Sequence, residues 1–242
     1  LSIAGPRFVD DRGRHVLLHG INLVNKDPDA GYFFDGGPAL FAAMRDWGFN
    51  VVRLGVIWDG LEPEPGVYDE DYLQRLDEQV AWAGEHGLWV FLDMHQDLYS
   101  ALYSDGAPAW ATLTGGAPHV DLGGVWSDAY FTSPAVQAAF DNFWDNASAP
   151  DGVGLQDHYA RAWALLARRY AGERAVLGYD IMNEPFLGSA AAAVQSLMFA
   201  KGAVLMTEMG MPLGNTAAID GDASPAEALA AFTDALLDAE AE

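Results

Sequence analysis

The sequence contains no cysteine, and this absence removes several kinds of chemistry. It excludes a disulfide framework, a cysteine-based metal site and a thiol nucleophile. Basic residues are also scarce: 12 Lys and Arg stand against 35 Asp and Glu, which gives a formal net charge of −23. A field of that sign repels phosphate backbones, so we expect no nucleic-acid partner.

Long apolar stretches are absent as well. No run approaches the roughly 18 residues of a membrane span, so no integral membrane segment is expected. The chain starts at Leu1 rather than at Met, and we expect a secreted protein whose signal peptide is not present in this chain. Its 242 residues, 51% of them hydrophobic, suffice for one sizeable core.

Apolar strand-like segments alternate along the chain with amphipathic helical ones. This alternation predicts a parallel sheet covered by helices, which fits either a (β/α)8 barrel or an open doubly wound sheet. No Gly-rich phosphate loop follows the first strand, and all the strands end in polar or aromatic side chains, which favours the barrel with its site at the strand ends. The predicted strands are 16–22, 51–56, 89–94 and 176–182, and the predicted helices are 38–46, 69–86, 133–142 and 155–170.

Two glutamates follow apolar strand-like segments. Glu184 lies in the triplet Asn183-Glu184-Pro185 after the fourth strand, and Glu208 follows a further short apolar run at residues 204–206. Glycoside hydrolysis needs such a pair of carboxyl groups, one to protonate the leaving oxygen and one on the opposite side of the anomeric carbon. Either residue could instead be an ordinary solvated glutamate at a strand end.

Five polar residues could support such a pair. Arg53 is a candidate for keeping the nucleophile ionised, or else for a buried structural ion pair. Asn183 could bond a sugar 2-hydroxyl, and His95 and His19 could bond other hydroxyls of the same sugar. Asp93 is interpreted as a structural hydrogen-bonding partner.

The run from Asp93 to Asp97 superficially resembles a metal-ligand cluster. Asp93, His95 and Asp97 alternate, which would align them on one face of a strand. Because only one histidine is present, we predict no metal site.

Taken together, these motifs resemble glycoside hydrolase family 5. The stretches 92–100, 106–112, 140–144 and 182–186 are similar in particular to its endoglycoceramidase-like members. The resemblance implies a retaining enzyme on a (β/α)8 barrel that hydrolyses the β-linkage between a glycan and ceramide without a cofactor. It also implies that Glu184 is the acid/base and Glu208 the nucleophile, with sugar contacts from Lys26, His95, Trp110 and Asn183.

The implied partner is a glycolipid or oligosaccharide, with transient contact to a lipid surface. The aromatic run Tyr32-Phe33-Phe34 could touch the lipid, or it could pack under a loop. A β-glucanase or β-glucosidase of the same family, or a non-catalytic sugar-binding barrel fragment, are the alternatives.

The chain departs from a complete barrel after Asn183. Only 242 − 183 = 59 residues follow, whereas four more βα units at roughly 30 residues each would need about 120. Strands five, six and eight are not evident. We therefore expect a single catalytic barrel domain over residues 1–242, with segments missing near 188–195 and after 242.

Overall fold

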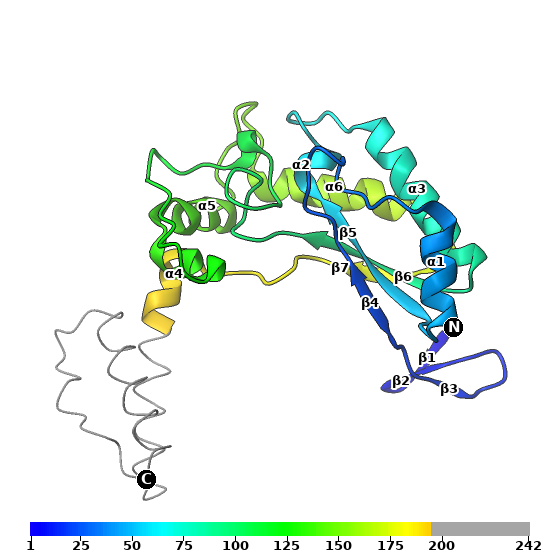
Figure 1. Ribbon diagram of the computed structural model, residues 1–242. Helices are drawn as coiled ribbons and strands as arrows, with labels where there is room; N and C mark the ends of the chain where they lie inside the picture. The colour runs from blue at the N-terminus through cyan, green and yellow to red at the C-terminus, as the bar shows by residue number, and fades with distance from the viewer. Residues whose placement is uncertain (195–242) are drawn as a thin grey trace, which may run out of the picture. The chain divides into compact units, whose positions relative to one another are not determined.

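A computed structural model of the protein describes residues 1–194 (Figure 1). Leu1–Pro185 form one compact unit, and a second unit begins at Phe186, with the short 3-10 helix η3 (Gly188–Ala190) in its described part. None of the helices within residues 1–194 has both the length and the apolarity needed to cross a bilayer.

The centre of the first unit is a four-stranded parallel sheet. Its strands are β4 (Gly20–Leu23), β5 (Val51–Ile57), β6 (Trp89–His95) and β7 (Val176–Asp180), and they pair in the order in which they occur along the chain. A small antiparallel sheet of β1 (Ser2–Ala4), β2 (Arg7–Val9) and β3 (His15–Val16) precedes it.

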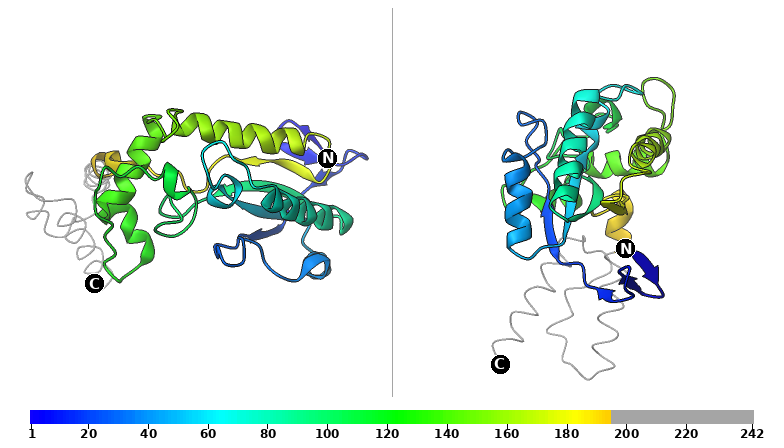
Figure 2. Two further views of the ribbon diagram at one scale, coloured as in Figure 1. Left: turned by 90° about the horizontal axis from the view of Figure 1, so that it is seen from above. Right: turned by 90° about the vertical axis from the view of Figure 1, so that its right-hand side faces the viewer.

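Helices connect the parallel strands. The long ones are α1 (Gly37–Asp46), α3 (Glu70–Glu85) and α6 (Leu155–Arg169), which follow one another across the sheet in strand order (Figure 2). The connection between β6 and β7 also carries η1 (Ala109–Ala111), η2 (Trp126–Asp128), α4 (Ala129–Thr132) and α5 (Pro134–Trp144), and the short α2 (Trp58–Leu61) follows β5.

The helix boundaries have local causes. Asp69 caps α3 by accepting a hydrogen bond from the Tyr72 amide, and Gly87 follows the helix with a φ of 70°, a left-handed value that glycine adopts without strain. The predicted apolar stripe of this helix is buried against the sheet and includes Leu76, which has no exposed surface. Helix α6 likewise buries Tyr159, Trp163 and Leu166, as its periodicity predicts, and Tyr170 directly after the helix is buried on the same stripe.

The two faces of the sheet differ in chemistry. Successive side chains of a strand point to opposite faces. Tyr179 packs against Trp163 of α6 with ring centroids 5.5 Å apart, and its neighbour Leu92 on β6 is fully buried, so this face is apolar and covered by helices. The opposite face carries charged and polar side chains, namely Arg53, Asp93, His95 and Asp180.

The first predicted strand was wrong in extent. Residues 16–22 do not form one strand, because Val16 pairs with Phe8 in the antiparallel sheet and the parallel strand begins only at Gly20. Leu17 between them is 85% exposed, so the apolar run reflects two short elements rather than one buried strand. The fourth strand also ends earlier than predicted, at Asp180.

Candidate active site

Arg53 organises the polar face of the sheet. One guanidinium nitrogen lies 2.7 Å from Asp93 on β6, and the other nitrogens donate to Asp180 on β7 at 2.6 and 2.9 Å. The same side chain reaches the Asn183 amide oxygen at 3.1 Å. The ion pair that we gave as the alternative for Arg53 is therefore present.

His95 ends β6 and joins this network. Its Nδ1 lies 2.8 Å from Asp93, whose side chain has no exposed surface. Asp93 thus bonds both Arg53 and His95, in agreement with the structural role predicted for it. The Nε2 of His95 faces the other way and lies 3.8 Å from Asp97.

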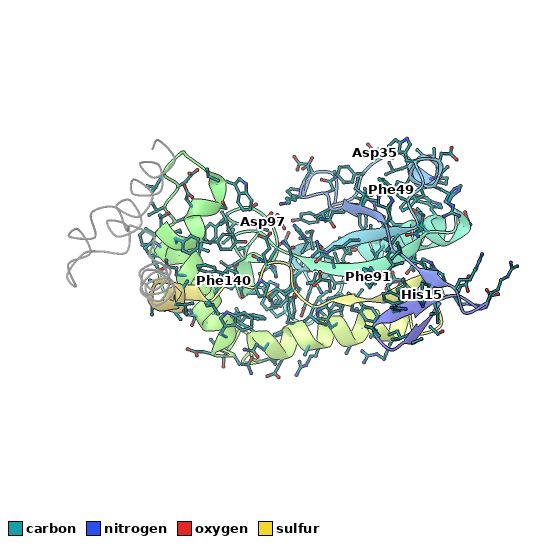
Figure 3. The ribbon with its side chains drawn as sticks, turned by 90° about the horizontal axis from the view of Figure 1, so that it is seen from below. His15, Asp35, Phe49, Phe91, Asp97 and Phe140 are labelled. Atoms are coloured by element: carbon teal, nitrogen blue, oxygen red, sulfur yellow. The ribbon has the colours of Figure 1, made fainter. Side chains whose placement is uncertain are left out.

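Lys26 follows β4 and meets two aspartates of the segment after β6. Its ammonium forms a short ion pair with Asp97 and lies 3.5 Å from Asp105. The structure thus brings together the predicted residues Lys26 and His95, which are 69 positions apart. Figure 3 shows Asp97 at this end of the sheet.

The sequence alone did not identify Asp105 as a residue of the site. It sits in a loop eight positions beyond Asp97 and shows no periodic or motif signal. In the fold its backbone pairs with that of Asp97 through hydrogen bonds of 3.1 and 3.3 Å, which places both carboxyl groups beside Lys26. Burial raises the pKa of Asp105, against the opposing effects of Lys26 and His95.

His95, Asp97 and Asp105 are also a group whose geometry could hold a cation, since their ligand atoms lie within 4.8 Å of one another. The Lys26 ammonium already bonds both aspartates. Asp93, which the sequence placed in such a cluster, instead bonds Arg53 and His95. The positive charge of this cluster is thus a lysine of the chain itself.

The segment after β7 is held from two sides. The Tyr159 hydroxyl and the Trp163 indole of α6 both donate to the Ile181 carbonyl, at 2.7 and 3.0 Å. From β6, the Met94 carbonyl accepts the Asn183 amide hydrogen at 3.1 Å. The end of β7 is therefore fastened to a helix and to the neighbouring strand.

Asn183 and Glu184 form the corner at the end of this segment. The Asn183 side chain accepts from Arg53 and donates to the Gln96 carbonyl at 3.1 Å, so its orientation is set while one N–H remains available for a ligand. Glu184 has a φ of 42°, a left-handed value that is uncommon outside glycine. Its side chain is exposed, as a group that must meet a substrate has to be.

Trp110 in η1 is half-buried and its indole N–H is already used. It donates to the Glu62 carbonyl at 3.0 Å, and the ring meets Trp58 and His158 edge to face at 5.5 and 4.8 Å. Any contact of Trp110 with a sugar would therefore use its ring surface rather than its N–H.

The prediction that His19 and His95 bind the same sugar was wrong. His19 directly precedes β4, beside Asn50, whereas His95 pairs with Ile57 at the other end of the same sheet. Seven residue steps along the strand, or about 23 Å, separate the two levels. Figure 3 shows Phe49, which packs against His19, at one end and Asp97 at the other. The error follows from the misplaced first strand.

The aromatic run after β4 is mainly core. Tyr32 and Phe33 are buried, and Phe33 packs against Tyr72 of α3 at 4.9 Å and lies under the Arg75 guanidinium. Only Phe34 is exposed. Packing, and not lipid contact, explains the first two rings.

An exposed apolar loop lies on the same side as Lys26. Leu122, Val125 and Trp126 each expose more than half of their surface, and the Lys26 ammonium lies 5.6 Å from the centre of the Trp126 ring. We call these three residues the apolar loop. Glu208 and the short strand predicted before it lie outside the described residues.

A charged edge of this kind, at the carboxyl ends of parallel strands covered by helices, is typical of barrel hydrolases. Residues 9–204 match the cellulase model of glycosyl hydrolase family 5. The chain belongs to that family, and its described sheet and helices are part of a (β/α)8 barrel.

Endoglycoceramidases are among the proteins similar to this chain. Endoglycoceramidase I from Rhodococcus hoagii is 37% identical over 194 residues, covering 78% of this chain and 37% of its own length. Endoglycoceramidase from Cyanea nozakii is 33% identical over 210 residues, covering 75% of this chain and 41% of its own length. This chain thus spans about two fifths of the length of these relatives.

Solved structures show the same likeness. Endo-glycoceramidase II from Rhodococcus sp. in a ganglioside GM3 complex superposes with a TM-score of 0.67 at 37% identity, over 81% of this chain and 47% of that one. The lactosyl-enzyme intermediate of the same protein superposes with a TM-score of 0.66 at 36% identity, over 83% of this chain and 49% of that one.

Proposed function

We propose that the protein is a retaining glycosidase that cleaves the β-glycosidic bond between glycan and ceramide in glycosphingolipids. The observation that carries the proposal is the Asn183-Glu184 corner, an exposed carboxyl at the end of β7 beside a charged, hydrogen-bonded strand edge. The relatives named above support the substrate class, and the lactosyl-enzyme form of one of them supports a covalent intermediate for the group.

In the proposed reaction, Glu184 first acts as an acid. Its carboxyl proton passes to the glycosidic oxygen as the bond to the anomeric carbon breaks, and ceramide leaves as an alcohol. The carboxylate of Glu208 forms the new bond to that carbon. Glu184, now a carboxylate, takes a proton from water, whose oxygen then displaces Glu208. Retention requires the two carboxyl groups to lie about 5 Å apart.

The charged edge supplies groups that suit a glycan. Lys26 and His95 offer donors, Asp97 offers acceptor oxygens, and Asn183 retains one free N–H, while the fully buried Asp105 helps to hold Lys26 in place. Hydroxyl-rich sugars are recognised by such sets of polar groups placed at fixed positions. We therefore add Asp97 to the residues proposed to contact the sugar.

Replacement of Glu184 by Gln tests this proposal. The amide cannot donate an acidic proton, and general acid catalysis contributes roughly 10²- to 10⁴-fold. We expect kcat/KM for glucosylceramide to fall by about that factor, while Glu85→Gln, an exposed glutamate at the end of α3, leaves it unchanged. Full activity of the Glu184 variant would refute the assignment, and cleavage of cellotetraose in preference to glucosylceramide would indicate a β-glucanase instead.

We also propose that the apolar loop touches the lipid portion of the substrate or the surface that carries it. Tryptophan beside apolar side chains suits the boundary between water and lipid. Its closeness to Lys26 puts it next to the proposed glycan site.

Replacement of Trp126 by Ala tests the contact. We expect slower cleavage of glucosylceramide in mixed micelles and an unchanged rate on a water-soluble aryl lactoside. Trp47→Ala is the matched control, because Trp47 is 65% exposed and packs on Phe49 at the opposite end of the sheet. Equal losses on both substrates would contradict a lipid role.

A further inference from the structure

The side chain of Gln96 is hydrogen-bonded to two successive backbone carbonyls, one on each side of the Glu184 Cα. Its Nε2 donates to the Asn183 carbonyl at 2.8 Å and to the Glu184 carbonyl at 3.1 Å. Its Oε1 accepts from the Tyr99 amide at 2.7 Å. Gln96 directly follows β6 and is only 5% exposed, so these bonds are made in a buried site.

These bonds determine the backbone of Glu184. The Asn183 carbonyl belongs to the peptide plane before the Glu184 Cα, and the Glu184 carbonyl belongs to the plane after it. Since both planes are tied to one nitrogen, φ and ψ of Glu184 are constrained together. The direction in which the Glu184 side chain leaves the backbone follows from these two angles.

The backbone that Gln96 holds is not one the chain would adopt by itself. Glu184 has a φ of 42°, and Leu98 and Tyr99 in the adjacent loop have φ values of 54° and 73°. Non-glycine residues in this region persist only where their surroundings hold them. Gln96 bonds two of the three, so it joins the strained turn after β6 to the strained corner after β7.

The absence of a side chain at Gly106 leaves room for Gln96. Its φ is 122°, and a Cβ placed on it would lie 2.6 Å from the Cβ of Gln96 and 2.6 Å from the Tyr99 carbonyl oxygen. A side chain at position 106 would therefore displace Gln96. The Tyr130 hydroxyl, 3.3 Å from Nε2, closes another side.

We propose that Gln96 is the positioning residue of the acid/base: it holds the Glu184 corner so that the carboxyl meets the glycosidic oxygen. This inference rests on the proposed function. Gln96 touches no reacting atom, and it acts only through the two proton transfers of Glu184, to the leaving oxygen and from water. The value of kcat/KM reports the steps up to the glycosyl-enzyme, so for a substrate whose leaving group departs without a proton this value is insensitive to Gln96.

The test compares two leaving groups. Gln96→Met keeps the approximate length of the side chain but removes its donors. For this variant we expect kcat/KM for glucosylceramide to fall about 10- to 100-fold, the scale of a misplaced catalytic group. For dinitrophenyl lactoside, whose phenolate needs no proton, we expect less than a threefold change. The basic limb of the pH profile of kcat/KM, which reports the acid, should also move.

The chain provides a matched control in Gln156. Its Nε2 also donates to two successive carbonyls, those of Phe143 at 2.8 Å and Trp144 at 2.7 Å, at the end of α5. Gln156→Met should change neither the ratio of the two substrates nor the pH profile. Melting temperatures verify that each variant is folded, and Gln96→Asn, which retains an amide but is shorter, replaces Gln96→Met if that variant does not fold.

Equal losses on both substrates, or no loss, would overturn the proposal. Crystal structures of the two variants decide the positioning independently of turnover: Glu184 should leave its left-handed conformation in Gln96→Met and keep it in Gln156→Met. An unmoved Glu184 in Gln96→Met overturns the inference. A wild-type protein that cleaves neither substrate refutes the proposed function, and the pair of structures still decides what holds the corner.

Discussion

Replacement of Arg53 by Met should be among the most destabilising single changes in the described part of the chain. Arg53 bonds Asp93, Asp180 and the Asn183 amide. Methionine fills much of the same volume but leaves all three without their cation. Among residues 1–194, Asp93 then keeps only His95 as a partner while its side chain remains fully buried.

The magnitude follows from the burial of each partner. Removing one member of a buried ion pair costs about 3–5 kcal/mol, because the other charge stays unpaired in the interior. The Asp180 side chain is 41% exposed and can be solvated, so its share is at most about 1 kcal/mol. We expect a total loss of about 4–6 kcal/mol in the free energy of unfolding, a large part of the 5–15 kcal/mol typical of a domain.

Urea denaturation of the wild type and the variants measures this loss from the shift of the midpoint at constant slope. Asp180→Asn is the control and should lose no more than about 1 kcal/mol. The double variant Arg53→Met with Asp93→Asn should be more stable than Arg53→Met alone, since it no longer buries an unpaired charge. A loss below 1 kcal/mol for Arg53→Met, or additive effects in the double variant, would refute the reasoning.

Two further changes probe carboxyl groups outside the Arg53 network. Glu62 and His158 are both fully buried and lie 2.8 Å apart, so Glu62→Gln should lower the free energy of unfolding by about 2 kcal/mol. The control Glu64→Gln, at an exposed neighbouring residue, should have no effect. Equal urea midpoints for the two variants would contradict this prediction. Partial burial opposes ionisation of Asp77, but hydrogen bonds that include two from Arg169 outweigh it and hold the pKa of Asp77 below its ordinary value. The stabilisation from ionised Asp77 is present above its ordinary pKa and disappears as the pH falls through the lowered pKa. We therefore expect Asp77→Asn to be less stable than the wild type by about 1 kcal/mol at pH 7 and equally stable in strong acid. A difference in unfolding free energy that persists in strong acid would contradict this prediction.

Local pattern sufficed for most of the elements and for one part of the site. The apolar runs of β5 and β6 and the periodicity of α3 and α6 are signals within a single segment, and the structure confirmed them. Strand ends also pointed to Glu184 and His95, because parallel strands present their carboxyl ends at one edge. Lys26 was predicted only from the resemblance to the family. The predicted extent of the first strand was wrong because an apolar run does not reveal whether its residues pair with one sheet or with two.

The remaining features depend on which segments meet. The Lys26 cluster needs Asp105, which a loop pairing brings beside Asp97, and no spacing in the sequence announces that pairing. Gln96 lies within the sequence motif at residues 93–97, but its hydrogen bond to Glu184 forms only because β6 and β7 are neighbours in the sheet. The sequence by itself determined which residue types are available at the strand ends. Tertiary structure decided which of them touch, because the contacts join residues tens of positions apart whose separation in space is set by strand order and register.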